Sequence, residues 1–139
     1  MAKWFCTLNL FSDKVMSPTE AAYVAGFTDG EGTVGVYRGR RKENRSGYRY
    51  QTVLRISNTD FAALEAIQRM CGNGRIVQVT APKNPNYRIG YALNFSSSQT
   101  TRILPQLIPY LVIKKRQAEL ALEFQLSIVN GRNISADKE

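Results

Sequence analysis

The sequence predicts an α+β fold, with one antiparallel sheet and helices on one of its faces. Two observations support it. Segments with apolar residues at every second position alternate with helix-like segments, in the order α-β-β-α-β-β-α-α. Strands that follow one another directly favour antiparallel pairing, since a parallel pair needs a long crossover. The 139 residues contain no internal repeat and fit one domain with a sizeable core.

The first predicted element is a helix from Pro18 to about Asp29. Ser17 suits the N-cap, Pro18 suits the first helical position, and Glu20 completes a capping box. Much of this helix consists of small residues: Ala21, Ala22, Ala25 and Gly26. A glycine inside a helix costs about 1 kcal/mol relative to alanine. Gly26 therefore indicates a close contact with another backbone.

Two strands should follow, over Thr33–Arg38 and Tyr48–Asn58, joined by the charged turn Gly39–Gly47. The first strand places Val34 and Val36 on one face. In the second strand, one face is suited to packing on helices and consists of Tyr50, Thr52, Leu54 and Ile56. The other face is polar and cationic and consists of Arg49, Gln51, Val53 and Arg55.

The rest of the chain completes the sheet and its helical cover. A helix is predicted over Thr59–Cys71 and should end at Gly72 or Gly74. Its inward residues are Phe61, Leu64, Ile67 and Met70. The remaining predictions are strands over Arg75–Thr80 and Tyr87–Phe95 around the turn Ala81–Asn86, a short helix from Ser97-Ser98 to Leu107, and a helix over Lys114–Asn130 stopped by Gly131. We expect an extension at residues 1–16, one domain at 17–131 and a tail at 132–139.

Composition excludes several kinds of chemistry. The chain has no histidine, which rules out a Ser-His-Asp triad, a Cys-His dyad and a His-ligated zinc site. Any hydrolysis must use carboxylates, lysine, hydroxyls or an oxygen-ligated metal. Cys6 and Cys71 form no disulfide framework and indicate a reducing, intracellular location, in a bacterial or archaeal cytoplasm or an organelle. No signal peptide or membrane span is predicted, so secretion and a membrane partner are not expected.

Positive charge is concentrated in one segment. The net charge is +8, and seven of the 19 Lys and Arg residues lie between Arg38 and Arg55, where Glu43 is the only acid. A solvated charge run is the ordinary explanation of such a segment. Here it spans a predicted hairpin with interleaved tyrosines and Gln51, and a two-stranded ribbon fits the DNA major groove. The pattern favours a nucleic acid over charge that serves solubility alone.

Two short motifs carry the remaining chemistry. Asp29-Gly30-Glu31-Gly32 lies at the C-terminal end of the first helix, where the helix dipole disfavours carboxylates. The segment is either an exposed acidic turn or a Mg²⁺ ligand, since this ion needs only one or two carboxylates. Lys114, Lys115 and Arg116 open the last helix against its dipole. They indicate a nearby anion or a solvated helix start.

The nine residues from Val24 to Gly32, with the sequence VAGFTDGEG, resemble the motif of the LAGLIDADG homing endonucleases. The Ala-Gly pair, the spacing to Asp29 and the closing Glu31-Gly32 all match, and Glu31 keeps the carboxylate of the final Asp. The order of strands and helices is similar as well. The segment LIPYLVIKKRQ, residues 107–117, resembles the family's second conserved stretch. The likeness covers roughly Pro18 to Asn130.

The resemblance implies a four-stranded, saddle-shaped sheet of the αββαββα type and a homodimer, because the chain has one motif and the family pairs two. It also implies metal-dependent hydrolysis of a long pseudo-palindromic double-stranded DNA site, on the order of 20 base pairs. The implied dimer contacts are Ala22, Ala25, Gly26 and Asp29. The resemblance assigns Mg²⁺, or another divalent cation such as Mn²⁺, to Glu31 and the Gly30 carbonyl. It assigns catalysis to Glu31, Lys114 and Asn58, while Ala62 stands where the family often has a basic residue.

We expect DNA contacts from the strands and the hairpin turn: Tyr37, Arg38, Arg40, Arg41, Arg45, Arg49, Gln51, Arg55, Arg75 and Arg88. Two alternatives remain open. The chain could be a family member without cleavage activity that acts as an intron RNA maturase or a transcription regulator. It could also be a basic structural or ribosome-associated protein, which would bind nucleic acid without sequence preference and with a steep salt dependence.

Overall fold

The computed structural model describes residues 14–79 and 83–138, and within them the predicted order of elements is confirmed. The helices are α2 (Pro18–Glu31), α3 (Phe61–Cys71), α4 (Ser97–Leu107) and α5 (Lys115–Lys138). The strands are β1 (Gly32–Arg40), β2 (Tyr48–Asn58), β3 (Arg75–Gln78) and β4 (Tyr91–Asn94). Of the predicted extension, only residues 14–16 lie in the described part, which does not include Cys6.

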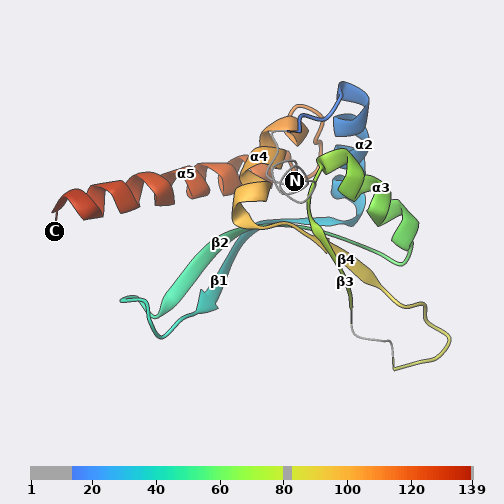
Figure 1. Cartoon of the computed structure of the whole chain (residues 1–139), viewed down its shortest axis with the longest axis horizontal. Coiled ribbons are helices and arrows are strands. Elements are labelled where there is room, and N and C mark those ends of the chain that lie inside the picture. The colour runs from blue at the N-terminus through green and yellow to red at the C-terminus, as the bar shows by residue number, and fades with distance from the viewer. Residues whose placement is uncertain (1–13, 80–82, 139) are drawn as a thin grey trace, which may run out of the picture.

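The four strands form one antiparallel sheet in the order β1-β2-β4-β3. Figure 1 shows that the sheet is arched, with all four helices on its convex side. We call the opposite side the concave face. In the described part of the chain, no helix combines the length and hydropathy that a membrane span requires. The arrangement is the predicted α+β fold.

Side-chain caps fix three helix starts. The predicted capping box of α2 is present, because Ser17 Oγ accepts from the Glu20 amide at 3.2 Å and the Glu20 carboxylate accepts from the Ser17 amide at 3.0 Å. Asp60 caps α3, which ends at Gly72 in the left-handed conformation. α4 is capped by Ser96, one residue before the predicted cap, and it accommodates Pro105.

Several predicted boundaries were wrong. Gly131 does not stop the last helix, which continues to Lys138, because a single glycine costs a helix only about 1 kcal/mol. Strands β3 and β4 are shorter than predicted: residues 87–90 lie outside β4, and part of the predicted turn at 81–86 lies outside the described residues.

Phe61, which was predicted as an inward residue of α3, does not point into the core. It is 43% exposed and meets the Tyr91 ring edge-on at 5.0 Å.

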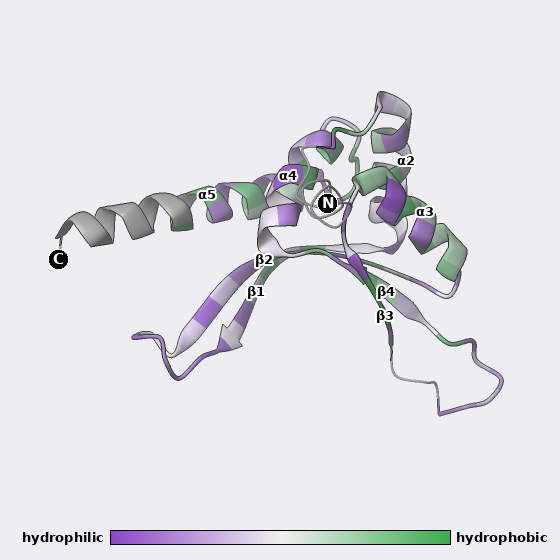
Figure 2. Cartoon of the chain, in the orientation of Figure 1, coloured by the Kyte–Doolittle hydropathy of each residue, from purple (hydrophilic) through white to green (hydrophobic). Residues whose placement is uncertain are grey.

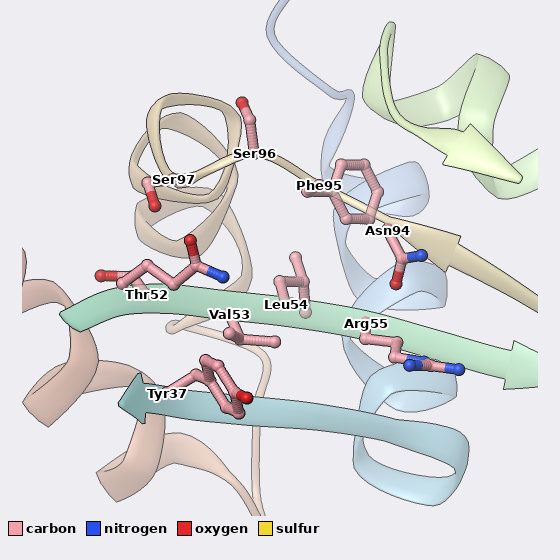
Figure 3. A pocket seen from close by; sticks show the side chains of 10 residues that line it. Tyr37, Thr52, Val53, Leu54, Arg55, Asn94, Phe95, Ser96 and Ser97 are labelled. Carbon is pink, nitrogen blue, oxygen red and sulfur yellow. The ribbon is translucent and has the colours of Figure 1, made fainter. Parts of the chain in front are cut away.

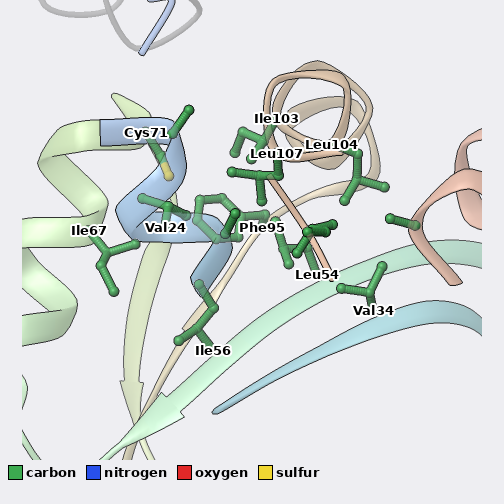
Figure 4. Close-up of a cluster of buried hydrophobic side chains, with 14 of the residues drawn as sticks. Val24, Val34, Leu54, Ile56, Ile67, Cys71, Phe95, Ile103, Leu104 and Leu107 are labelled. Atoms are coloured by element: carbon green, nitrogen blue, oxygen red, sulfur yellow. The ribbon is translucent and has the colours of Figure 1, made fainter. Parts of the chain in front are cut away.

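The core lies between the convex face of the sheet and the helices (Figure 4). Leu54 and Ile56 of β2 are fully buried there, as the alternation in the sequence predicted. The helices cover them with side chains that are likewise buried: Val24, Leu64, Ile67, Ile103, Leu104 and Leu107. Each buried side chain of this size contributes roughly 1.5–3 kcal/mol. All four described helices pack on the convex side of the sheet, and none of them covers the concave face.

Strand register determines which side chains share the concave face. Thr33, Gly35, Tyr37 and Gly39 of β1 pair with Arg55, Val53, Gln51 and Arg49 of β2. Arg55 also pairs with Asn94 of β4, which pairs with Arg75 of β3. The residues between these pairs, such as Leu54 and Leu93, are buried on the convex side. Two faces of opposite character follow, as predicted for β2.

Candidate functional site

The concave face bears cations and hydrogen-bonding groups and carries no carboxylate among its described strand residues. Arg49, Arg55 and Arg75 are exposed, and Tyr37 is 58% exposed. Figure 2 shows that the outer parts of β1, β2 and their connecting turn are strongly hydrophilic. The predicted side-chain alternation of β2 therefore places Arg49, Gln51 and Arg55 on one open surface.

A small pocket lies at the tip of the hairpin. It measures about 210 Å³ and is lined by Tyr37, Gly39, Arg40, Arg41, Arg49 and Gln51. A Cβ on Gly39 would approach the Tyr37 ring to 3.1 Å, so the glycine leaves room for that ring. Several cations and a phenol thus surround a space suited to a phosphate or a base edge.

The structure divides the hairpin arginines between two faces. Arg38 pairs with Tyr50 on the convex side, and its guanidinium lies 4.5 Å from the centre of the Tyr48 ring. Arg40 has the same parity but also lines the tip pocket, where β1 ends. Arg45 belongs to the turn and Arg88 to the exposed segment before β4. The alternation of residues along the sequence could not show which of these arginines lie on the concave face.

A second pocket on this surface brings in a residue that the sequence analysis missed. Tyr37, Gln51, Arg55 and Asn94 are among the residues that line a cavity of about 370 Å³, and Figure 3 shows Asn94 and Arg55 on neighbouring strands. Asn94 stands in register between Arg55 and Arg75. Among the described residues, no hydrogen bond involves the side chain of Asn94. Only the strand pairing could have identified it.

Glu31 is the last residue of α2 and is exposed beside the concave face. It shares an open pocket of about 410 Å³ with Arg55, Asn58 and other residues of β2 and the β3–β4 connection. Asn58 Oδ1 accepts from the Asp60 amide at 2.7 Å, which fixes its orientation. The structure therefore brings together Glu31 and Asn58, and it adds Arg55, which had been predicted only as a DNA contact. Ala62 is exposed on α3 and supplies no charge.

Asp29 binds the segment that precedes α5. Its two carboxylate oxygens accept from the amides of Val112 at 2.8 Å and Lys114 at 2.9 Å. Burial disfavours ionisation, but the amides of Val112, Lys114 and Ile113, together with the Lys114 charge, outweigh it and lower the pKa of Asp29 below its ordinary value. The carboxylate of Asp29, a residue that the resemblance implies as a dimer contact, thus binds backbone amides of its own chain.

Lys114 completes this clamp from the other side. Its Nζ donates to the carbonyl oxygens of Thr28 at 3.0 Å and Asp29 at 2.7 Å. The negative end of the α2 dipole therefore has the compensating cation that its carboxylates require. The sequence indicated an anion near Lys114, and the negative end of the α2 dipole takes this place. The Lys114 ammonium does not line the pocket that contains Glu31. Lys114 holds the peptide units just before Gly30 and Glu31.

We expect Asp29→Asn to destabilise the protein by about 2 kcal/mol at pH 7, because an amide replaces a carboxylate that accepts charge-assisted hydrogen bonds. The folded pKa of Asp29 is lowered, so its contribution is complete above the unfolded value of about 3.9 and is lost as pH falls through the folded pKa. Urea unfolding measures this effect. The difference in the free energy of unfolding between variant and wild type should be smaller in acid than at pH 7. Asp60→Asn is the matched control, because Asn caps helices as well as Asp. A gap that is equal at every pH would contradict this assignment.

The predicted contact residues on α2 differ in exposure. Ala22 and Gly26 are exposed, and Asp29 is partly buried in its clamp. Ala25 is fully buried in the core of its own chain, so it has no surface to offer a second copy. Gly30 is exposed at the same helix end as Glu31. The open stripe of α2 therefore runs through Ala22, Gly26 and Gly30, with Tyr23 beside it.

Comparison with known protein families gives one match. The model described as LAGLIDADG endonuclease matches residues 24–125, which include the C-terminal part of α2, the whole sheet and the first part of α5. No protein with curated annotation matches the sequence.

Solved structures share the fold. The homing endonuclease I-CvuI, in complex with its target in the presence of 2 mM Ca, is 23% identical with a TM-score of 0.67 over 85% of this chain and 73% of that one. The archaeal intron-encoded homing endonuclease I-Vdi141I, complexed with DNA, is 25% identical with a TM-score of 0.68 over 84% and 72%. The meganuclease I-SmaMI, bound to uncleavable DNA, is 18% identical with a TM-score of 0.69 over 90% and 42%. The partner in these complexes is DNA, and an intron RNA partner finds no support.

Proposed function

The chain belongs to the LAGLIDADG endonuclease family, and we propose that it is a sequence-specific endonuclease that cleaves double-stranded DNA as a homodimer with the aid of a divalent cation. The observation that carries this proposal is the position of Glu31. It is an exposed carboxylate at the rim of a concave face whose described strand residues include cations but no acid. Such a face attracts the phosphate backbone, and a carboxylate beside it is suited to binding a metal ion against DNA.

The donor groups at the end of α2 fit Mg²⁺ or Mn²⁺. Glu31 supplies a carboxylate, and the last carbonyls of a helix, here including Gly30, lack helical partners. The described residues contain no cluster of three or more His, Cys, Asp or Glu side chains. Mg²⁺ does not need one, because it commonly uses one or two carboxylates together with substrate phosphates and water. When bound, the cation would supply an activated water and neutralise phosphate charge.

The other residues near Glu31 have separate parts in this proposal. Asn58 is held by the Asp60 amide at its oxygen, so its NH₂ group is available to orient the attacking water. Arg55 supplies positive charge in the same pocket. Lys114 is a positioning residue, since it neutralises the helix end that carries Gly30 and Glu31.

The surface of α2 supports a homodimer. A Cβ on Gly26 or Gly30 would meet nothing within 4 Å in its own chain, so the fold of one chain does not require either glycine. Close approach of a second α2 would require both. The Asp29 clamp also presents Val112 and Ile113, which are 82% and 69% exposed. Apolar side chains held rigidly on the surface are suited to burial by a second copy.

Cleavage of a selected DNA tests the proposal. The protein should enrich a palindromic site from a library of randomised half-sites, and it should cut that site in Mg²⁺ but not in EDTA. A footprint with two-fold symmetry is expected, since each chain supplies half of the saddle. Tight, specific binding without cutting would favour the cleavage-inactive alternative. Weak binding to all sequences would favour the basic structural alternative.

A further inference from the structure

The concave face includes a mostly apolar strip close to Glu31, which differs in this from the hairpin, although Arg55 and Asn58 line the same pocket. Val77 of β3 stands in register with Ala92 of β4, and Ala92 pairs with Ser57 of β2. Val79 continues β3 by one residue, and its amide donates to the Gly90 carbonyl at 2.8 Å. Among these residues, only Ser57 has a side chain that can form a hydrogen bond.

We propose that Val77 and Val79 recognise the C5-methyl groups of thymines in the inner part of each half-site. This inference rests on the proposed function, which it deepens by naming the base chemistry that the β3–β4 half of the sheet selects. The DNA major groove offers one apolar group, the thymine methyl. A valine side chain can pack against that methyl group but cannot form hydrogen bonds with the polar base edges.

The position of the strip determines which bases it meets. Val79 and Ser57 line the same pocket as Glu31, so the strip lies beside the proposed site of cleavage. The tip pocket lies at the far end of the β1–β2 hairpin. A half-site read by this face therefore has a thymine-selective inner part and an outer part read by arginine and glutamine.

The surface of the strip is available to a ligand. Val77, Val79 and Ser57 are half-buried, while Ala92 is fully buried between its neighbours. None of the four described helices covers this side of the sheet (Figure 1). The strip also continues directly into the row Arg55–Asn94–Arg75, two residues further along the strands. One DNA duplex would contact both rows, and this continuity identifies DNA as the occupant.

Uracil substitution tests the proposal, because uracil differs from thymine only by the methyl group. In the selected site, replacing the inner thymines by uracil should weaken binding by wild-type protein about fourfold for each methyl lost. The same replacement in the outer part should have little effect. Binding is measured in EDTA, so the result does not depend on cleavage.

Variants then assign the effect to the two valines. Val77→Ala and Val79→Ala should weaken binding to the thymine site and lose most of the discrimination between thymine and uracil. Val77→Thr retains a methyl group and a strand-forming side chain, so it should keep the discrimination. Val15→Ala is the matched control, because Val15 is 75% exposed just before α2 and lies beside α4, which packs on the convex side of the sheet. A 5-methylcytosine in place of an inner cytosine should strengthen binding through the same contact.

The possible results distinguish a failure of the thymine assignment from a failure of the proposed function. A specific site that tolerates uracil at every inner position, or a loss that persists unchanged in both alanine variants, overturns the thymine assignment alone. Failure to enrich any site overturns the proposed function and the thymine assignment with it.

Discussion

Glu31→Gln should lower the single-turnover rate of DNA cleavage by about a thousandfold or more. The amide keeps the size and one oxygen of the side chain but removes the charge that would bind the cation. A metal ion contributes several kcal/mol to phosphoryl chemistry, and each 1.36 kcal/mol corresponds to a factor of ten in rate. Rates are compared on the selected site in saturating Mg²⁺.

In the absence of metal, Glu31→Gln should not weaken DNA binding and should instead strengthen it. Glu31 is exposed beside the proposed path of the DNA backbone, so its charge repels phosphate when no cation is present. In the proposed dimer, the close contact of the two α2 helices would also bring the two Glu31 carboxylates near each other. The variant should therefore bind DNA at least as tightly in EDTA and dimerise more readily. Glu65→Gln, on α3, is the control for the loss of one carboxylate. Cleavage within tenfold of wild type would remove Glu31 from the metal site.

Gly26→Ala should have opposite effects on the monomer and the dimer. In one chain the added Cβ meets nothing within 4 Å, and alanine is about 1 kcal/mol more favourable than glycine in a helix, so the monomer should become more stable. In a dimer with two α2 helices in close contact, each added methyl overpacks the interface at a cost of typically 1–3 kcal/mol. Because the dimer carries both, the dissociation constant should rise about 30-fold or more.

Urea unfolding at several protein concentrations measures both effects, since only dimer stability depends on concentration. Sedimentation equilibrium gives the dissociation constant directly. Gly35→Ala is the control, because it also adds a Cβ in open space but lies on β1 and not on α2. A dimer unchanged by Gly26→Ala would place the interface elsewhere. A destabilised monomer would mean that its own chain requires the glycine.

The parts of the fold that were predicted correctly depend on local signals. The capping box at Ser17, the alternation of β2 and the glycine after Cys71 are each contained within a few residues, and each is where it was expected. The errors lie where local signals compete with packing. Phe61 fits the apolar pattern of α3 but packs against Tyr91 at the surface, and Gly131 is a weak stop signal in a helix that continues to Lys138.

The candidate site was predictable only in part. Glu31 and the alternation of Arg49, Gln51 and Arg55 follow from the sequence, because a motif and a period of two are both local. Asn94 and the apolar strip at Val77 could not be found in this way, since a residue's neighbours on a sheet face depend on strand register. The role of Lys114 likewise required its contact with the end of α2, because Lys114 lies just before α5 and is 85 residues away from Asp29 in the sequence.

The sequence by itself determined the class of fold, the order of its elements, the concentration of positive charge on one hairpin and the exclusion of histidine chemistry. These properties depend on composition and short-range periodicity, which need no knowledge of distant contacts. The tertiary structure decided which cations share the concave face, how Lys114 neutralises the end of α2, and that Val77 and Ala92 form an apolar row. It decided them because strand register and helix packing bring together residues that no local pattern connects.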